Sequence, residues 1–215
     1  MSTFDRISTP IETRIATGFA RISTAMRSKA WAQAAANGLT PTQADILHLL
    51  ASRNAPLRLS VIVEQLAVTA ATASDAVSAL VSKKLVEKGR AADDGRAIAL
   101  KLTRAGAKLA ASVADWTGFL AAAAGTLDED EKAVMLKLII KMIRTLQQRG
   151  DIPVNRMCVT CRYFAPNAHD NPRAPHHCHL VDAPFGERHL RLDCPEHEEA
   201  EEILQQRNWA AFVGV

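Results

Sequence analysis

The stretch LVEKGRAADDGRAIALKLTRAG, residues 85–106, decides the fold. Its two short runs, 85–90 and 97–102, have the residues of brief extended strands, and Asp93-Asp94-Gly95 between them is typical of a tight turn. The stretch therefore predicts a β-hairpin. Thr103 follows directly and can cap a helix that we expect to run to Ala124.

Helical patterns precede the hairpin. In residues 9–38, apolar side chains recur at three- and four-residue steps and Asn37-Gly38 supplies a stop, which predicts a long amphipathic helix. Thr40-Pro41 begins a second helix that ends near residue 54. Residues 59–66 and 69–84 predict two short helices with a tight connection, a helix-turn-helix. Followed by a hairpin and another helix, this order is a winged-helix layout.

A further helix is expected after Gly125. The stretch from Thr126 to Glu129 fits a capping box, with basic residues toward the other end. Between them, residues 134–146 are apolar over more than one face of a helix. Such a helix needs a partner on two sides, and the simplest partner is a second subunit, so we expect long dimerisation helices and a homodimer.

Residues 59–106 resemble the MarR family of bacterial transcriptional regulators, and the likeness in architecture extends over about residues 9–149. The motifs that carry it are the start of a recognition helix, a wing-tip Asp-x-Arg and a Leu-Thr-x-x-Gly after the wing: Ala71-Thr72-Ala73-Ser74, Asp94-Gly95-Arg96 and Leu102-Thr103-Arg104-Ala105-Gly106. The resemblance implies a mainly α fold with a small β-hairpin wing (α+β). It also implies a regulator, expected to be a repressor, that binds a pseudo-palindromic operator in double-stranded DNA.

The resemblance also implies DNA-contacting residues. Four polar side chains would face the major groove, and Arg96 would enter the minor groove while Asp94 holds its guanidinium. Residues 83–108 contain eight Lys and Arg against three Asp and Glu, as phosphate binding requires. The expected DNA-binding residues are Thr72, Ser74, Asp75, Ser78, Lys83, Lys88, Arg90, Asp94 and Arg96. Two positions depart from the family pattern, because Asp75 is acidic and Lys84 replaces a usual glycine.

The chain has 215 residues and a net charge of only +3, but its two parts differ. Residues 1–150 carry 20 Lys and Arg with 13 Asp and Glu, whereas residues 151–215 carry 6 and 10. All four cysteines and six of the seven histidines also follow residue 150. We therefore predict a DNA-binding and dimerisation domain over 1–150 and a metal-binding segment over 151–215. Residues 151–194 hold most of the prolines and little periodicity, so this stretch is not expected to build a core from apolar packing alone.

The cysteines indicate a metal centre. Cys158 and Cys161 form a C-x2-C pair, and Cys178 and Cys194 follow after intervals of sixteen and fifteen residues. The ligands of a structural zinc site usually occur as two pairs that are closely spaced in the sequence. A four-cysteine iron–sulfur cluster, in contrast, tolerates cysteines that lie far apart in the sequence. A 4Fe–4S cluster is the preferred prediction, zinc the alternative, and redox disulfides a further possibility.

Other residues near the cysteines leave the ligand set open. A histidine can replace one thiolate in a zinc site, although each of these histidines more often lies on the surface. Arginines near the cysteines would stabilise an anionic cluster. Alternatively, they only balance the charge of the acidic residues that follow in the sequence. The histidines concerned are His176, His177, His179 and His197, and the arginines are Arg162, Arg188 and Arg191.

The preferred function is a regulator in which the cluster senses redox state, iron or a diatomic gas. The alternative is the same type of regulator with a structural zinc site and a small-molecule effector. An enzyme is not expected, because no phosphate loop or nucleophile motif occurs; a redox enzyme would leave the helix-turn-helix unexplained. The sequence contains no run of about 18 apolar residues, so no membrane span is expected. The N-terminal residues lack an apolar signal region, so a cytoplasmic location is expected.

Overall fold

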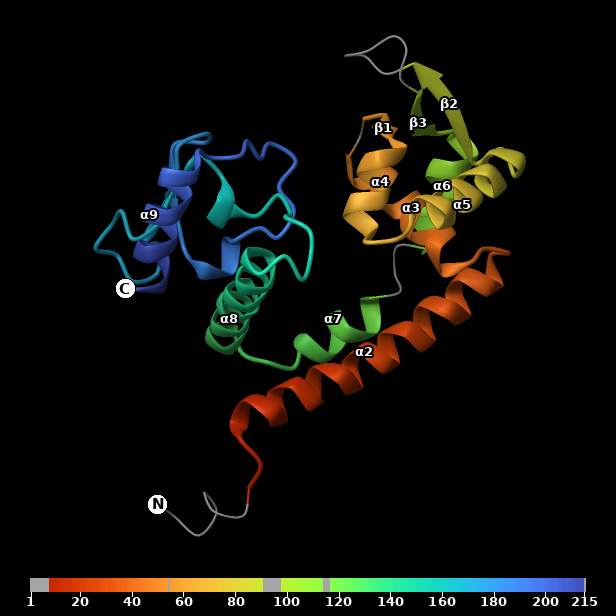
Figure 1. Cartoon of the computed structure of the whole chain (residues 1–215). Helices are drawn as coiled ribbons and strands as arrows, with labels where there is room; N and C mark the ends of the chain where they lie inside the picture. The colour runs from red at the N-terminus through yellow and green to blue at the C-terminus, as the bar shows by residue number, and fades with distance from the viewer. Residues whose placement is uncertain (1–7, 54, 91–97, 114–116, 215) are drawn as a thin grey trace. The chain divides into compact units, whose positions relative to one another are not determined.

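The computed structural model describes residues 8–53, 55–90, 98–113 and 117–214 (Figure 1). The chain divides into two compact units. The first contains residues 1–58 and 71–119, and the second contains residues 59–70 and 120–215. In the part of the chain that is described, no helix is long and apolar enough to cross a membrane.

The first unit is built on helices α2 (Ile11–Ala36) and α3 (Pro41–Arg53), which pack together. Gly38, with a φ of 65°, follows the end of α2, as the Asn-Gly pair predicted. A capping box begins α3: the Gln43 N–H donates to Thr40 Oγ1 at 3.3 Å, and the Thr40 N–H donates to Gln43 Oε1 at 3.4 Å. Helix α3 also packs on α6 (Arg104–Val113) and β3.

The predicted hairpin is present in this unit. Strands β2 (Val86–Arg90) and β3 (Ile98–Leu102) are antiparallel, with Val86 opposite Leu102, and β1 (Leu57–Arg58) pairs with the other edge of β3. The hairpin tip, residues 91–97, lies outside the described residues, and with it Asp94 and Arg96. The fold class is thus confirmed: mainly helical, with small antiparallel sheets.

The Leu-Thr-x-x-Gly sequence has a local physical cause. Thr103 Oγ1 donates to the Lys84 carbonyl at 2.8 Å and accepts from the Gly106 N–H at 3.0 Å, which caps α6. At residue 106, a Cβ atom would lie 1.9 Å from the Leu85 carbonyl oxygen. Only glycine permits this approach of α6 to the start of the wing.

Two short helices, α4 (Leu59–Leu66) and α5 (Ala70–Ser82), follow the predicted helix-turn-helix order along the chain. After α5, Lys84 has a φ of 57°, in the left-handed region that favours glycine. Its N–H donates to the Val81 carbonyl at 2.9 Å and the Leu85 N–H to the Leu80 carbonyl at 3.0 Å, which ends the helix. Lys84 therefore adopts the left-handed conformation that glycine adopts most easily, which explains why the family pattern usually has glycine at this position.

The helix predicted over residues 103–124 is described as two separate helices, α6 and α7 (Gly118–Ala124), with residues 114–116 outside the description. In the second unit, α8 (Glu129–Gln148) begins with a capping box. The pair that forms it is Asp128 with Glu131, not Thr126 with Glu129 as predicted. Thr126 Oγ1 instead donates to the Ala123 carbonyl at 2.7 Å, so it is occupied by the end of α7.

The rest of the second unit consists of short elements. A 3-10 turn, η2 (Cys158–Thr160), precedes an antiparallel sheet of β4 (Phe164–Ala165), β5 (His176–Cys178) and β6 (Ala183–Phe185), with β5 central. A second 3-10 turn, η3 (Glu187–His189), packs on α8, and the final helix α9 (Glu202–Val213) packs on η2.

The C-terminal segment contributes to an apolar core that it shares with α8. Seven buried residues from α8, the short elements and α9 form it: Ile140, Met157, Val159, Cys161, Phe164, Leu190 and Phe212. Ile140 of α8 and Phe212 of α9 complete this core, in keeping with the prediction that residues 151–194 do not build a core from apolar packing alone. The second unit thus joins residues 151–214 to α8.

The outer face of α8 is also apolar. Leu136, Ile140 and Ile143 pack into the core at helical spacing, whereas Val134 and Leu138 are 58% and 53% exposed. The prediction that this helix is apolar on more than one side is therefore confirmed. One side is covered by the C-terminal segment of the same chain.

Candidate nucleic-acid interface and cysteine site

Helix α5 separates its apolar and polar side chains. Ala73, Ala76, Val77 and Leu80 are buried, at the three- and four-residue steps of one helical face. The polar residues expected to contact DNA all lie on exposed positions: Thr72, Ser74, Asp75 and Ser78. This short helix can therefore offer hydroxyl groups and one carboxylate to an external partner.

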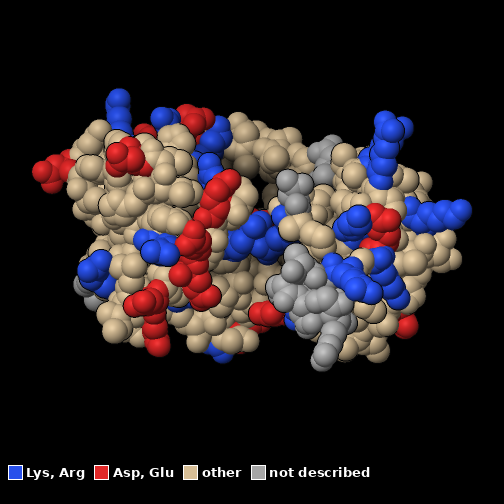
Figure 2. Space-filling view, turned by 90° about the horizontal axis from the view of Figure 1, so that it is seen from above, with Lys and Arg blue, Asp and Glu red and all other residues tan. Residues whose placement is uncertain are grey.

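Basic residues lie on the strand that follows. Lys88 and Arg90 are exposed on β2, and Lys101 of β3 forms an ion pair with Glu87 at 3.0 Å. On the visible face of the unit that contains these strands, Lys and Arg side chains predominate over acidic ones (Figure 2). The exposed positive charges of this strand would attract the phosphate groups of a nucleic-acid backbone.

Lys83 has a different position. Its ammonium group donates to the Gly38 carbonyl at 2.6 Å and to Gln43 Oε1 at 2.9 Å, so two of its three N–H donors are used where α2 meets α3. Lys83 therefore stabilises this helix junction. Sequence reasoning could not distinguish it from Lys88, because both are simply lysines beside the predicted helix.

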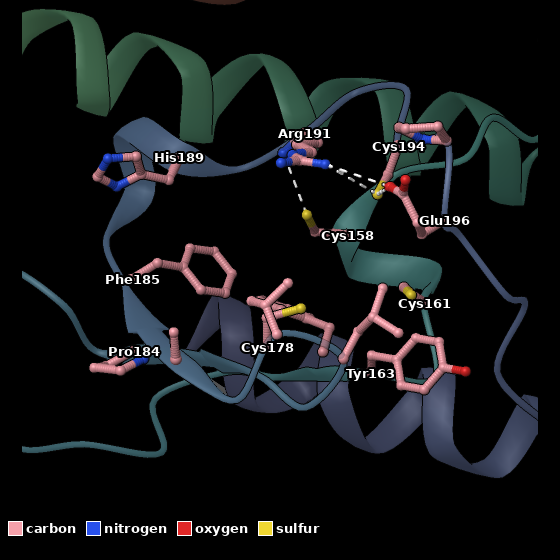
Figure 3. Close-up of a pocket in the computed structure, with 15 residues that line it drawn as sticks. Cys158, Cys161, Tyr163, Cys178, Pro184, Phe185, His189, Arg191, Cys194 and Glu196 are labelled. Carbon is pink, nitrogen blue, oxygen red and sulfur yellow. Dashed lines mark hydrogen bonds and ion pairs between the residues drawn. The ribbon is translucent and has the colours of Figure 1, made fainter.

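All four cysteines line one cavity of about 620 Å³ in the second unit (Figure 3). Cys158 is on η2, Cys161 follows this turn, Cys178 ends β5, and Cys194 lies in the segment before α9. All four are free of disulfide bonds. The rest of the lining is mostly apolar and aromatic, including Tyr163, Phe164 and Phe185.

Arg191 contacts two of these cysteines. Its main-chain N–H donates to Cys158 Sγ at 3.2 Å, and its guanidinium Nη1 donates to Cys194 Sγ at 3.5 Å (Figure 3). Of the three arginines considered from the sequence, Arg191 is the one that lines the cavity. The Arg162 guanidinium instead bonds the Glu198 carboxylate at 3.1 Å.

The environment of Cys158 opposes its ionisation. Burial raises the pKa of this thiol to about 11; the hydrogen bond from Arg191 acts in the opposite direction, and the other three cysteines add to the increase. Cys158 is thus the thiol on which burial and the neighbouring cysteines act together. A positive centre bound between the four thiols would reverse this effect and favour the thiolates.

The four histidines that flank the cysteines along the chain do not line the cavity. His176 is fully buried, and its Nδ1 accepts from the Asn167 N–H at 3.2 Å; burial lowers its pKa. His177 lies 3.1 Å from His169 between ring nitrogens, and His197 Nε2 lies 3.0 Å from Thr160 Oγ1. The cavity is lined instead by His189, a residue that sequence reasoning missed because it does not flank a cysteine along the chain.

No group of three or more His, Cys, Asp or Glu side chains is arranged to hold a metal ion as these side chains are placed, within residues 8–53, 55–90, 98–113 and 117–214. For comparison, a tetrahedral zinc ion bound by thiolates at about 2.3 Å holds its sulfur atoms about 3.8 Å apart. A four-iron cluster binds one thiolate per iron and separates the sulfur atoms more widely.

The fold and the exposed polar helix beside basic strands define a winged-helix protein. Residues 37–97 match the sequence model of the MarR family. A search among curated proteins finds no match.

Two solved structures of MepR from S. aureus are similar to this chain. A MepR–DNA complex is 27% identical, covers 61% of this chain and 97% of its own, and has a TM-score of 0.53. A MepR mutant from a multidrug-resistant clinical isolate is 27% identical, covers 62% and 97%, and has a TM-score of 0.52. These similarities support the winged-helix fold, and residues 37–97 add a sequence likeness to the MarR family. MepR itself is a transcription regulator of a multidrug efflux pump.

Proposed function

We propose that this chain is a homodimeric DNA-binding repressor of the MarR type, acting in the cytoplasm. The observation that carries the proposal is the exposed polar face of α5 beside the basic strand β2, within the stretch that matches the family. MepR, a similar protein, has been solved in complex with DNA. Thr72, Ser74, Asp75 and Ser78 would read base edges, with Lys88 and Arg90 on phosphates.

The dimer is supported by apolar side chains that the chain leaves exposed. On α2, Ile11, Ile15 and Phe19 are 59%, 46% and 41% exposed, in addition to the outer face of α8. Faces of this kind commonly mark interfaces between subunits. A dimer would place two copies of α5 on two half-sites of a pseudo-palindromic operator.

The second part of the proposal is that Cys158, Cys161, Cys178 and Cys194 bind a 4Fe–4S cluster. Its support is that four free thiols, from η2 and the residue after it, from β5 and from the segment before α9, line one cavity. Arg191, a cationic residue, donates hydrogen bonds to two of them. Each thiol would lose its proton when it binds iron. The cluster would report redox state, iron or a diatomic gas to the DNA-binding part.

Coupling between the two functions would run through α8. The segment that contains the cysteines shares a core with the inner face of α8, and the outer face of this helix is the proposed dimer contact. Loss of the cluster would allow the turns around the cavity to move and would weaken their packing against α8. The spacing of the two recognition helices would change as a result.

The DNA-binding proposal is tested by selecting duplexes from a random library with the full-length protein. The enriched sites should contain an inverted repeat. Arg96→Ala should weaken binding to a selected site about tenfold or more and reduce its dependence on salt, because a groove-inserted cation is lost. Arg14→Ala on α2 is the control. Equal affinity of the wild type and Arg96→Ala would refute the wing assignment.

A further inference from the structure

The cysteine cavity has a charged edge formed by two residues. Arg191 donates to Cys158 Sγ at 3.2 Å and to Cys194 Sγ at 3.5 Å, so one residue contacts both ends of the cysteine set. Glu196 Oε2 lies 3.7 Å from the Arg191 guanidinium and 3.8 Å from Cys194 Sγ. Among the described residues that line the cavity, these two are the only Lys, Arg, Asp or Glu side chains.

The main chain holds this edge in place. The Cys158 N–H donates back to the Arg191 carbonyl at 3.1 Å, and the Cys194 N–H donates to the Arg156 carbonyl at 2.9 Å. An ion pair between Arg156 and Asp193 at 2.7 Å joins the same two segments. Because main-chain bonds fix the position of residue 191, a change of its side chain should leave the cysteines in place.

We propose that Arg191 and Glu196 are opposed charges that set the reduction potential of the cluster, a conclusion that rests on the proposed function. A 4Fe–4S core with four thiolates carries a net charge of 2−, and one electron from an added reductant makes it 3−. Nearby positive charge and N–H donors stabilise the more negative form, whereas a carboxylate destabilises it. Arg191 therefore raises the potential and Glu196 lowers it.

The two side chains are also exposed enough to respond to solvent. Arg191 and Glu196 have side-chain exposures of 59% and 58%, so salt screens both charges. The effect of each charge on the cluster should consequently decrease at high ionic strength. The hydrogen bond from the Arg191 main-chain N–H to Cys158 is shared by all side-chain variants and does not change between them.

The test is a spectroelectrochemical titration of the full-length, cluster-loaded protein without oxygen. Arg191→Gln should shift the midpoint to more negative potential and Glu196→Gln to more positive potential, and both shifts should shrink in high salt. Arg162→Gln is the matched control, because Arg162 adjoins Cys161 but bonds Glu198. Its midpoint should stay at that of the wild type.

Unchanged midpoints in both variants, or shifts in the same direction, would overturn the inference, since opposed charges require opposite signs. If Arg191→Gln fails to retain a cluster, two other variants decide. Glu196→Gln must shift the midpoint to more positive potential, and the charge-conserving Arg191→Lys must keep the wild-type midpoint. Failure of the wild type to bind iron and sulfide is a different result. It refutes the cluster itself, and the inference with it.

Discussion

Residue 106 lies where the wing meets the following helix, and its lack of a side chain lets the two approach. A Cβ atom there would lie 1.9 Å from a main-chain oxygen, so Gly106→Ala must shift backbone. We expect the free energy of unfolding to fall by about 1–3 kcal/mol, measured by urea denaturation. In Gly18→Ala, the control on α2, the new methyl would meet nothing within 4 Å and should not destabilise. Equal stability of both variants would contradict the packing described for α6.

His176 makes stability depend on pH. Its burial lowers its pKa from the ordinary value of 6.5, so the unfolded chain binds more protons than the fold below that pH. The free energy of unfolding should therefore decrease as the pH falls below 6.5, and His176→Gln should reduce this dependence. His48→Gln, at an exposed position, is the control. Chemical denaturation at several pH values measures the effect, and an unchanged slope in His176→Gln would count against it.

The same residue shows where sequence reasoning ended. His176 is buried against Phe164 and Phe185, which lie on two other strands of the sheet, with ring centroids 5.3 and 5.6 Å away. Neither its spacing nor its neighbours along the chain distinguish it from an exposed histidine. Arg191 and Arg162 were likewise equivalent in the sequence, and only the fold brings the first one to the sulfur atoms.

At the scale of elements, local patterns were sufficient where local interactions form the structure. Helix α3 begins where Thr40-Pro41 predicted, and the hairpin strands pair on either side of the Asp-Asp-Gly sequence. The cap of α8 was predicted two residues too early, because two possible cap pairs lie two residues apart and Thr126 belongs to the end of α7. The core of the second unit could not be predicted, because it joins Ile140, Met157 and Phe212 from distant parts of the chain.

Helix α8 carries the prediction about assembly. Leu138→Glu places a carboxylate on its exposed apolar face, so it should convert a dimer to a monomer without unfolding the chain, since this residue is outside the core. Light scattering after size exclusion gives the mass, and circular dichroism reports the helix content. The control is Gln148→Glu, an exposed position near the end of the same helix. A dimer that persists in Leu138→Glu would exclude this face as the interface.

For the whole molecule, the small net charge of +3 combines a basic first part with an acidic second part. The cysteines lie in the acidic part, and the exposed polar helix lies in the basic part. This difference in charge is a property of the composition alone. Composition did not reveal that α8 shares its core with the residues after 150, because that contact depends on the folded arrangement.

The most direct test of the account is the affinity of the protein for a selected operator with and without the cluster. Without oxygen, the loaded protein should contain four iron and four sulfide per chain, and chelator treatment should change its DNA affinity at least tenfold. The four-fold Cys→Ser variant should have the affinity of the stripped wild type before and after treatment. Equal affinity of the loaded and stripped wild type would contradict the central claim that the cysteine site controls DNA binding.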